Sequence, residues 1–130
     1  MKVLKFGGTS VGSVESIRQI QQIIAGQTVD CIVVVSALGG VTDQLLRAAR
    51  LALESSEEYM EEYQAIRHRH IEMINKLIDN PTTKQILLLE VESILDELRS
   101  ILFGVHLVKD LSPKSEAVIV SYGEQLSSRI

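Results

Sequence analysis

Two short apolar runs, each followed by a pair of glycines, constrain the fold of this chain more than any other feature. Residues 3–6 lead into Gly7-Gly8, and residues 31–35 lead into Gly39-Gly40. Between the runs, residues 14–24 carry apolar side chains at helical spacing. A strand, a helix and a second strand within so short a stretch predict a βαβ unit with parallel strands. Because the second run is continuously apolar and β-branched, we expect that strand to be buried on both faces.

The first loop has the composition of a phosphate-binding turn. Gly7 and Gly8 let the backbone turn sharply and approach a ligand, Ser10 adds a hydroxyl group, and Lys5 adds a positive charge at the rim. Free backbone amides at such a turn, next to a helix that Ser13 is placed to cap, suit an anion. The pattern is not a P-loop, because there the lysine follows the glycines. A tight strand-to-helix turn without a ligand remains the alternative.

The second loop repeats this composition. Ser36, Gly39, Gly40 and Thr42 again combine adjacent glycines with hydroxyl groups. Parallel strands place their following loops at one edge of the sheet, where α/β folds bind ligands. We therefore expect the two loops to lie together, and their conjunction is a more specific signal than either loop alone.

The middle of the chain is predicted to be helical. Thr42 or Asp43 can cap a first helix, and Ser55 and Glu58 have the spacing of a capping box that opens a second. A third helix is predicted over about residues 83–105, and we expect the second and third to pack antiparallel as a hairpin.

Proline marks two further boundaries. Asn80-Pro81 ends the second of these helices, and Ser112-Pro113 fits an N-cap followed by proline, so we predict a helix from Pro113 onward. Gly123 inside that helix costs about 1 kcal/mol relative to alanine, which suggests close approach of another backbone or of a ligand. Glu124 beside it either faces that gap or is an ordinary exposed glutamate, and the residues alone favour the second interpretation.

Charge and composition narrow the class of protein. The chain has 130 residues, a net charge of −4 and a single cysteine, Cys31, which we expect to be buried. The lack of a basic stripe argues against nucleic acid and against an anionic membrane surface, and no apolar stretch is long enough to span a membrane. One cysteine forms no internal disulfide, so we expect a cytoplasmic protein. We interpret Arg67–His70 as a solvated basic face, because a His-x-His pair on a helix does not present both rings to one metal.

Three stretches together resemble the aspartate kinases. Residues 5–11 (KFGGTSV) resemble the first motif of that family, residues 34–43 (VVSALGGVTD) its second, and residues 121–128 (SYGEQLSS) its third. Tyr122 and Gln125 stand where other residues are frequent in the family. The order and spacing agree over the whole chain. The long helical insertion is most similar to that of the bifunctional enzymes that fuse aspartokinase to homoserine dehydrogenase.

The resemblance implies an α/β fold, the amino-acid-kinase-like αβα sandwich, here truncated and helix-rich with an N-terminal βαβ unit. It also implies ATP-dependent phosphorylation of the β-carboxylate of L-aspartate, with Mg²⁺ carried by the nucleotide and no metal site in the chain. Lys5 would be catalytic and would contact the ATP phosphates together with Gly7, Gly8 and Ser10. The implied substrate-binding residues are Ser36, Gly39, Thr42 and Glu124, with Glu124 on the amino group of aspartate.

The resemblance further implies the first step of lysine, threonine and methionine biosynthesis, allosteric control and a homo-oligomeric parent. We expect residues 1–130 to be the N-terminal part of an amino-acid-kinase catalytic domain and to be inactive alone. Two alternatives remain open. One is another amino-acid or carbamate kinase of the same fold, and the other is a non-catalytic helical interaction module whose glycine loops are only turns.

Overall fold

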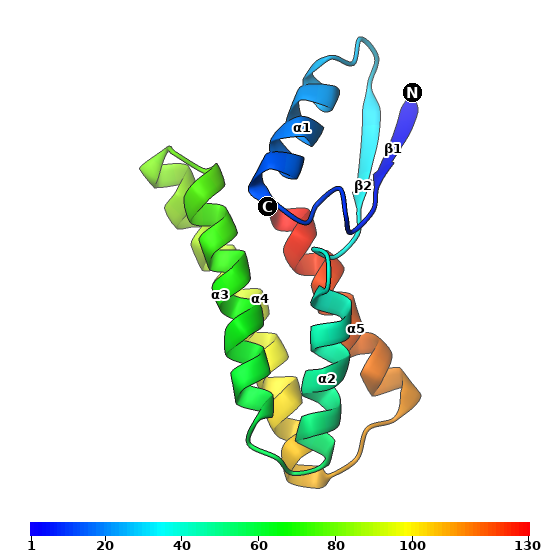
Figure 1. The fold of residues 1–130 in the computed structure, drawn as a ribbon, viewed down its shortest axis with the longest axis vertical. Coiled ribbons are helices and arrows are strands. Elements are labelled where there is room, and N and C mark those ends of the chain that lie inside the picture. Colours follow the sequence, from blue (N-terminus) through cyan, green and yellow to red (C-terminus); the bar gives the residue numbers. More distant parts are fainter.

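The computed structural model describes all residues from 1 to 130 as a small βαβ unit joined to a helical bundle (Figure 1). The βαβ unit precedes the bundle in the chain. The elements, in order, are β1 (Lys2–Phe6), α1 (Val14–Ala25), β2 (Cys31–Val35), α2 (Val41–Leu53), α3 (Tyr59–Leu77), α4 (Pro81–Val108) and α5 (Pro113–Arg129).

The βαβ unit forms as the sequence predicts. β1 and β2 are parallel, in a register that pairs Lys2 with Cys31 and Phe6 with Val35. The amide of Ser36 donates to the carbonyl of Phe6 at 3.0 Å, which extends the ladder to the start of the second loop. The Ser13 hydroxyl caps α1 by accepting from the amide of Ser16 at 3.1 Å. Strand pairing and the cap together fix where both loops begin and end.

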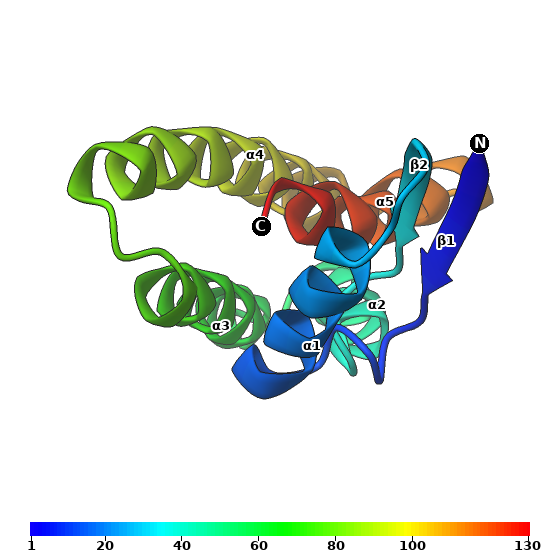
Figure 2. The same ribbon diagram turned by 90° about the horizontal axis from the view of Figure 1, so that it is seen from above.

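The expected burial of β2 on both faces is wrong. Ile32 is 50% exposed and Val34 is 42% exposed, and Cys31, predicted to be buried, is only partly covered. The sheet has just two strands, so β2 has a free edge, and the neighbouring α1 and α5 leave much of the strand uncovered (Figure 2). An apolar run reports the chemistry of a strand and not how many neighbours cover it.

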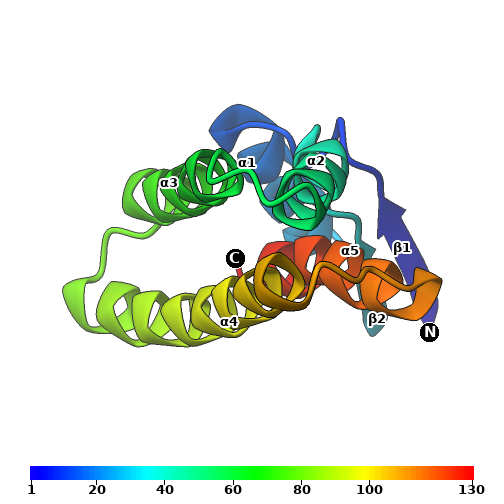
Figure 3. The same cartoon turned by 90° about the horizontal axis from the view of Figure 1, so that it is seen from below.

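The other four helices form a bundle that holds most of the core (Figure 3). α3 and α4 run antiparallel, which confirms the predicted hairpin, and α2 and α5 pack against them. Leu45, Ile66, Leu98 and Leu102 are completely buried between these helices. None of the helices combines the length and the apolar character that crossing a membrane requires.

Both proline boundaries are confirmed. The Ser112 hydroxyl accepts from the amide of Ser115 at 3.1 Å, and α5 begins at Pro113. The Asn80 side chain accepts from the amide of Thr83 at 3.0 Å. Because Asn80 is therefore the cap, α4 begins at Pro81 and reaches Val108, which is longer than predicted at both ends.

The caps predicted for the helices after the second loop, Thr42 or Asp43 and Ser55, are wrong. α2 begins at Val41, and its N-cap is Gly40 with φ of 84°, so neither Thr42 nor Asp43 caps it. Ser55 lies in a left-handed turn with φ of 61°, and the hydroxyl of Ser56 accepts from the amide of Glu58 instead. α3 consequently begins at Tyr59.

Candidate functional site

The two glycine loops lie in direct backbone contact at the carboxyl ends of β1 and β2. A Cβ atom added to Gly39 would stand 3.1 Å from the carbonyl oxygen of Gly8, and one added to Gly8 would stand 3.4 Å from that of Ala37. A side chain at Gly39 would require the first loop to shift slightly, whereas one at Gly8 would reach van der Waals contact with the second loop. The predicted meeting of the loops at one edge of the sheet is therefore confirmed, and their glycines are what permits it.

The loops also carry backbone N–H groups that have no backbone acceptor. None of the amides over 7–10 or over 37–40 donates to a backbone carbonyl, whereas Val11 and Val41 do, at 3.2 and 2.9 Å. Clustered free amides at a helix start form a concave site for an anion. The arrangement is therefore chemically able to bind a phosphate group.

The polar side chains predicted for the phosphate group lie at the rim of this region. Lys5 is exposed on β1 beside Val34, and it makes neither an ion pair nor a side-chain hydrogen bond. Ser10 and Gly7 are exposed as well. Lys5 lies two residues before Gly7, so it places an unpaired positive charge on the end of β1 that leads into the first loop.

The hydroxyl residues of the second loop are less exposed than Ser10 of the first loop. Ser36 and Thr42 are partly buried, and Thr42 lies in the first turn of α2. Gly40, at the N-cap, needs its positive φ so that the chain can leave the loop and enter the helix directly. Within the first turn of α2, the amides of Thr42 and Asp43 have no backbone acceptor, whereas the amide of Val41 donates to the carbonyl group of Leu38.

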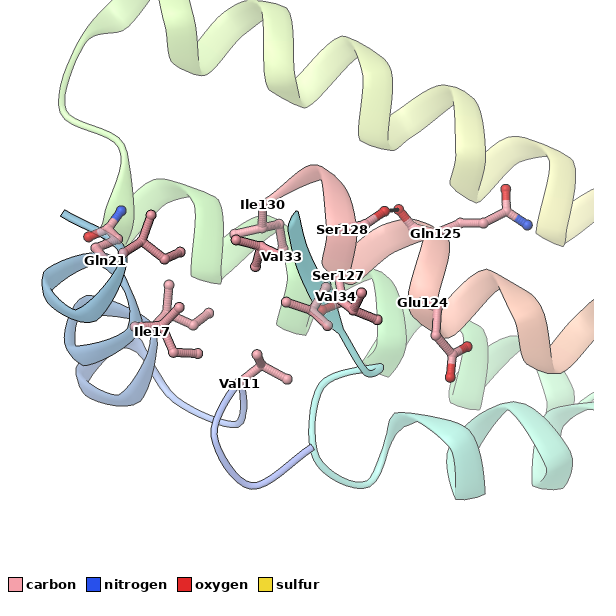
Figure 4. Close-up of a pocket in the computed structure, with 13 residues that line it drawn as sticks. Val11, Ile17, Gln21, Val33, Val34, Glu124, Gln125, Ser127, Ser128 and Ile130 are labelled. Atoms are coloured by element: carbon pink, nitrogen blue, oxygen red, sulfur yellow. Dashed lines mark hydrogen bonds between the residues drawn. The ribbon is translucent and has the colours of Figure 1, made fainter. Parts of the chain in front are cut away.

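α5 packs against the second loop through Gly123. A Cβ atom on Gly123 would lie 2.7 Å from Cβ of Ala37 and 3.4 Å from Leu45, so only glycine fits without a shift. The sequence predicts that another part of the chain or a ligand approaches Gly123 closely, and the structure shows that the second loop does so at Ala37. The next residue, Glu124, is exposed and leaves α5 on the side of the β2–α2 connection (Figure 4). Glu124 is thus placed near the loops without being buried between them.

An apolar groove lies beside the loops and has different chemistry. It has a volume of about 550 Å³ and runs between α1, β2 and the end of α5, with Ile17, Val33 and Ile130 among its lining residues (Figure 4). Glu124 is the only predicted site residue in it. Apolar walls do not stabilise a phosphate or a carboxylate. The loops, and not this groove, are the candidate site.

The expected solvated basic face over residues 67–70 is wrong. Arg67 pairs with Glu92 of α4, and His70 is completely buried, with its Nδ1 2.7 Å from the carbonyl oxygen of Ile66. Burial lowers the pKa of His70, which favours the neutral ring. Arg69 donates to the carbonyl groups of Gly39 and Gly12. Only His68 is exposed as predicted.

Arg69 is the residue of this region that sequence reasoning missed. On α3 it follows the buried Ile66 by three positions and precedes the buried Met73 by four, so helical spacing already places it at the edge of the packed face. That spacing was the available signal. No group of three or more His, Cys, Asp or Glu side chains is arranged to hold a metal ion.

Comparison with known proteins establishes the family. The sequence model of the amino acid kinase family matches residues 1–130. This chain belongs to the amino acid kinase family. Among relatives of this amino acid kinase chain, aspartokinase 1 of Arabidopsis thaliana is 32% identical over 98% of the chain and 22% of its own length. The aspartokinase of Chlamydia trachomatis is 35% identical over 98% of the chain and 26% of its own length.

Bifunctional enzymes are also among the relatives of this amino acid kinase chain. The aspartokinase/homoserine dehydrogenase of Buchnera aphidicola is 30% identical over 98% of the chain and 16% of its own length. The structure of E. coli aspartokinase III with aspartate and ADP superposes with a TM-score of 0.83 and 28% identity, over 98% of this chain and 27% of the other. The same enzyme with lysine and aspartate matches equally well, which confirms the predicted fold class. The chain spans about a fifth to a quarter of the first of these relatives.

Proposed function

We propose that residues 1–130 form the phosphoryl-transfer side of an aspartate kinase active site. The observation that carries this proposal is the backbone contact between the Gly7-Gly8 and Gly39-Gly40 loops, with their free amides beside Lys5. Phosphoryl transfer asks mainly for positioning and for positive charge on the non-bridging oxygens. Two amide-rich loops and one unpaired lysine offer both.

In this proposal the first loop binds the nucleotide. The amides of Gly7 and Gly8 and the hydroxyl of Ser10 would bind ATP phosphate oxygens, and the Lys5 ammonium would stabilise the charge that develops on the transferred group. Mg²⁺ would arrive with the nucleotide, since the chain has no carboxylate or imidazole cluster of its own for a resident metal. The ADP bound by E. coli aspartokinase III supports nucleotide use.

The second loop and α5 would bind the acceptor. Ser36, Gly39 and Thr42 would line the path of the aspartate β-carboxylate, and the Glu124 carboxylate would accept hydrogen bonds from the α-ammonium group. The contact of Gly123 with Ala37 supports this assignment, because it keeps Glu124 on the loop side of α5. The aspartate bound by E. coli aspartokinase III supports the choice of amino acid.

The broader roles stay predictions from the resemblance. They are a place in lysine and threonine biosynthesis, allosteric control, a homo-oligomeric state and a cytoplasmic location. The lysine bound by E. coli aspartokinase III supports an amino-acid effector for this chain's complete protein.

An acceptor panel tests the proposal. The complete protein is incubated with ATP, Mg²⁺ and hydroxylamine, which converts an acyl phosphate into a hydroxamate, and with aspartate, glutamate or carbamate in turn. We expect ADP release and hydroxamate formation with aspartate alone. Reaction with glutamate or carbamate in its place would assign the chain to another amino acid kinase, and no ADP release with any acceptor would contradict a kinase. Residues 1–130 alone should not turn over, because positioning contributes roughly 7–11 kcal/mol and requires the whole site.

A further inference from the structure

Arg69 connects α3 to both glycine loops. Its Nη1 donates to the carbonyl oxygen of Gly39, and its Nη2 donates to that of Gly12 at 3.3 Å. The first carbonyl belongs to the second loop, and the second lies directly before the Ser13 cap of α1. One planar guanidinium therefore joins segments that are 30 and 57 residues away in the sequence.

These contacts have no substitute within the chain. No backbone N–H donates to the carbonyl group of Gly12 or of Gly39. Arg69 itself makes no ion pair with a carboxylate. Its side chain is partly buried, and burial lowers its pKa. The loops therefore depend on Arg69 for these hydrogen bonds, and Arg69 depends on the loops.

A neighbouring arginine shows the contrast. Arg67, two residues earlier on α3, pairs with the Glu92 carboxylate of α4, where Nε and Oε2 are 3.4 Å apart. That contact joins two helices of the bundle and touches neither loop. Arg67 has an ordinary interhelical role, whereas Arg69 has only loop carbonyls as partners.

The orientation of the two carbonyl groups has a consequence for the amides. In a trans peptide the C=O and the next N–H point in opposite directions, and the chain contains no cis peptide bond. With their carbonyl groups held toward Arg69, Gly39 and Gly12 direct the amides of Gly40 and Ser13 away from it. Neither of these amides has a backbone acceptor. Arg69 thus holds these two carbonyl oxygens, which would repel an anion, on its own side of the loops. The free amides, which would attract an anion, point to the opposite side.

We propose that Arg69 is a positioning residue, whose guanidinium holds the Gly12 and Gly39 carbonyl groups and so fixes the two glycine loops relative to each other. In this role Arg69 acts through the loops and not by contact with the phosphate or the amino acid. The kinetic test rests on the proposed kinase function, whereas the structural test does not. Arginine is required because its fork offers two donors in one plane, and a lysine ammonium is a single point of charge.

The kinetic test compares Arg69→Met, Arg69→Lys and the matched control Arg67→Met in the complete protein. A shift of loop position on the order of 1 Å can cost about 10²-fold in rate, so we expect Arg69→Met to lower kcat by roughly 10- to 100-fold. Arg69→Lys should recover only a small part of kcat. Arg67→Met should keep kcat within a factor of two or three of the parent, since its contact lies away from the loops.

The structural test follows amide hydrogen exchange in the same variants. Arg69→Met should speed exchange of the hydrogen-bonded amides of the two loops by roughly tenfold or more, as expected when a hydrogen bond from a charged group is lost. These are the amides of Val11, Gly12, Ser36 and Val41. Exchange in the interior of α4 should stay unchanged. If Arg69→Met fails to fold, Arg69→Lys, which keeps the charge and most of the stem, decides by the same loop exchange.

The outcomes separate the two proposals. Unchanged exchange in both loops overturns the role of Arg69, whether or not the protein is a kinase. A second result also overturns this role. It is a loss of kcat in Arg69→Met that is explained by a lower thermal midpoint, together with full recovery of kcat in Arg69→Lys. A complete protein without kinase activity contradicts the proposed function, while faster loop exchange in Arg69→Met still supports the loop-positioning role.

Discussion

The loop end of the molecule and the middle of its bundle are held together by different means. At the loop end, glycine backbones touch, Lys5 and Glu124 are exposed, and a single arginine bridges the segments. In the bundle, Leu95 and Leu98 are completely buried among apolar neighbours. Burial of apolar surface dominates stability, whereas chemistry needs polar groups that a ligand can reach. Substitutions in the bundle should therefore change mainly the stability, and substitutions at the loop end should change mainly kcat or KM.

The largest expected effect is on stability, in the bundle. Leu98→Ala removes a completely buried side chain from α4 and should destabilise the bundle by roughly 2–5 kcal/mol. Amide exchange of α3 and α4 in the complete protein measures this, and kcat of the folded protein should not change. Leu89→Ala is the matched control, because Leu89 is 66% exposed on the same helix and should cost under about 0.5 kcal/mol. Equal costs at the two positions would contradict the assignment of the core.

The next largest effect is on catalysis, at the loops. Lys5→Ala in the complete protein should lower kcat by roughly 10²–10³, as expected on removal of one preorganised transition-state donor. The thermal midpoint should stay the same, because Lys5 is exposed and unpaired. Lys5→Arg should not restore kcat fully, since the guanidinium fork is larger than an ammonium.

Lys2→Ala provides the control for charge. Lys2 is also exposed on β1, at the opposite end of the strand from the loop. The Lys2→Ala variant should have a kcat within a factor of a few of that of the unsubstituted protein. A similar result for Lys5→Ala would mean that the first loop is structural and that the phosphate role is wrong.

Glu124 tests the acceptor side, with a smaller effect. Hydrogen bonds to charged groups contribute about 1.5–3 kcal/mol, so Glu124→Gln should raise KM for aspartate by roughly ten- to a hundredfold. KM for ATP should stay nearly unchanged. Steady-state kinetics with each substrate varied in turn measures both constants. Glu116→Gln, in the first turn of the same helix, is the control, and an unchanged aspartate KM in Glu124→Gln would remove that residue from the site.

Features set by a few adjacent residues could be predicted from the sequence. Hydroxyl or amide side chains followed by proline mark the starts of α4 and α5, and two apolar runs with glycine loops indicate the βαβ unit and the shared edge. These signals succeed because the cap, the turn and the strand are formed within short stretches of chain.

Features that depend on distant segments could not be predicted. Arg69 finds its partners in Gly12 and Gly39, His70 is buried by other helices, and the exposure of β2 depends on how many elements cover it. The roles of Lys5 and Glu124 stay predictions, because they depend on a ligand and not on contacts within the chain. The sequence around each residue indicates at most which face of a helix is packed, and it does not identify the distant segment that the residue contacts.

Gly123 tests the junction between the two ends. Gly123→Ala would place a Cβ atom 2.7 Å from Cβ of Ala37, so α5 or the second loop must move. Overpacking costs typically 1–3 kcal/mol, which exceeds the roughly 1 kcal/mol that α5 gains in helix propensity. We expect a lower thermal midpoint together with a higher KM for aspartate. An unchanged KM with a lower midpoint would mean that the contact supports the fold alone.

Gly104→Ala is the same substitution within α4 of the bundle, and its effect on stability should have the opposite sign. Gly104 lies inside α4, and an added Cβ atom would meet nothing within 4 Å. Without a clash, only the helix propensity changes, so we expect stabilisation by about 1 kcal/mol, slower amide exchange near the end of α4 and no change in kcat or KM. Destabilisation in the complete protein would instead show that something covers α4 there. The exposed Phe103 and Leu107 beside Gly104 would then belong to a contact surface, because a free helix face gives an added methyl group nothing to displace.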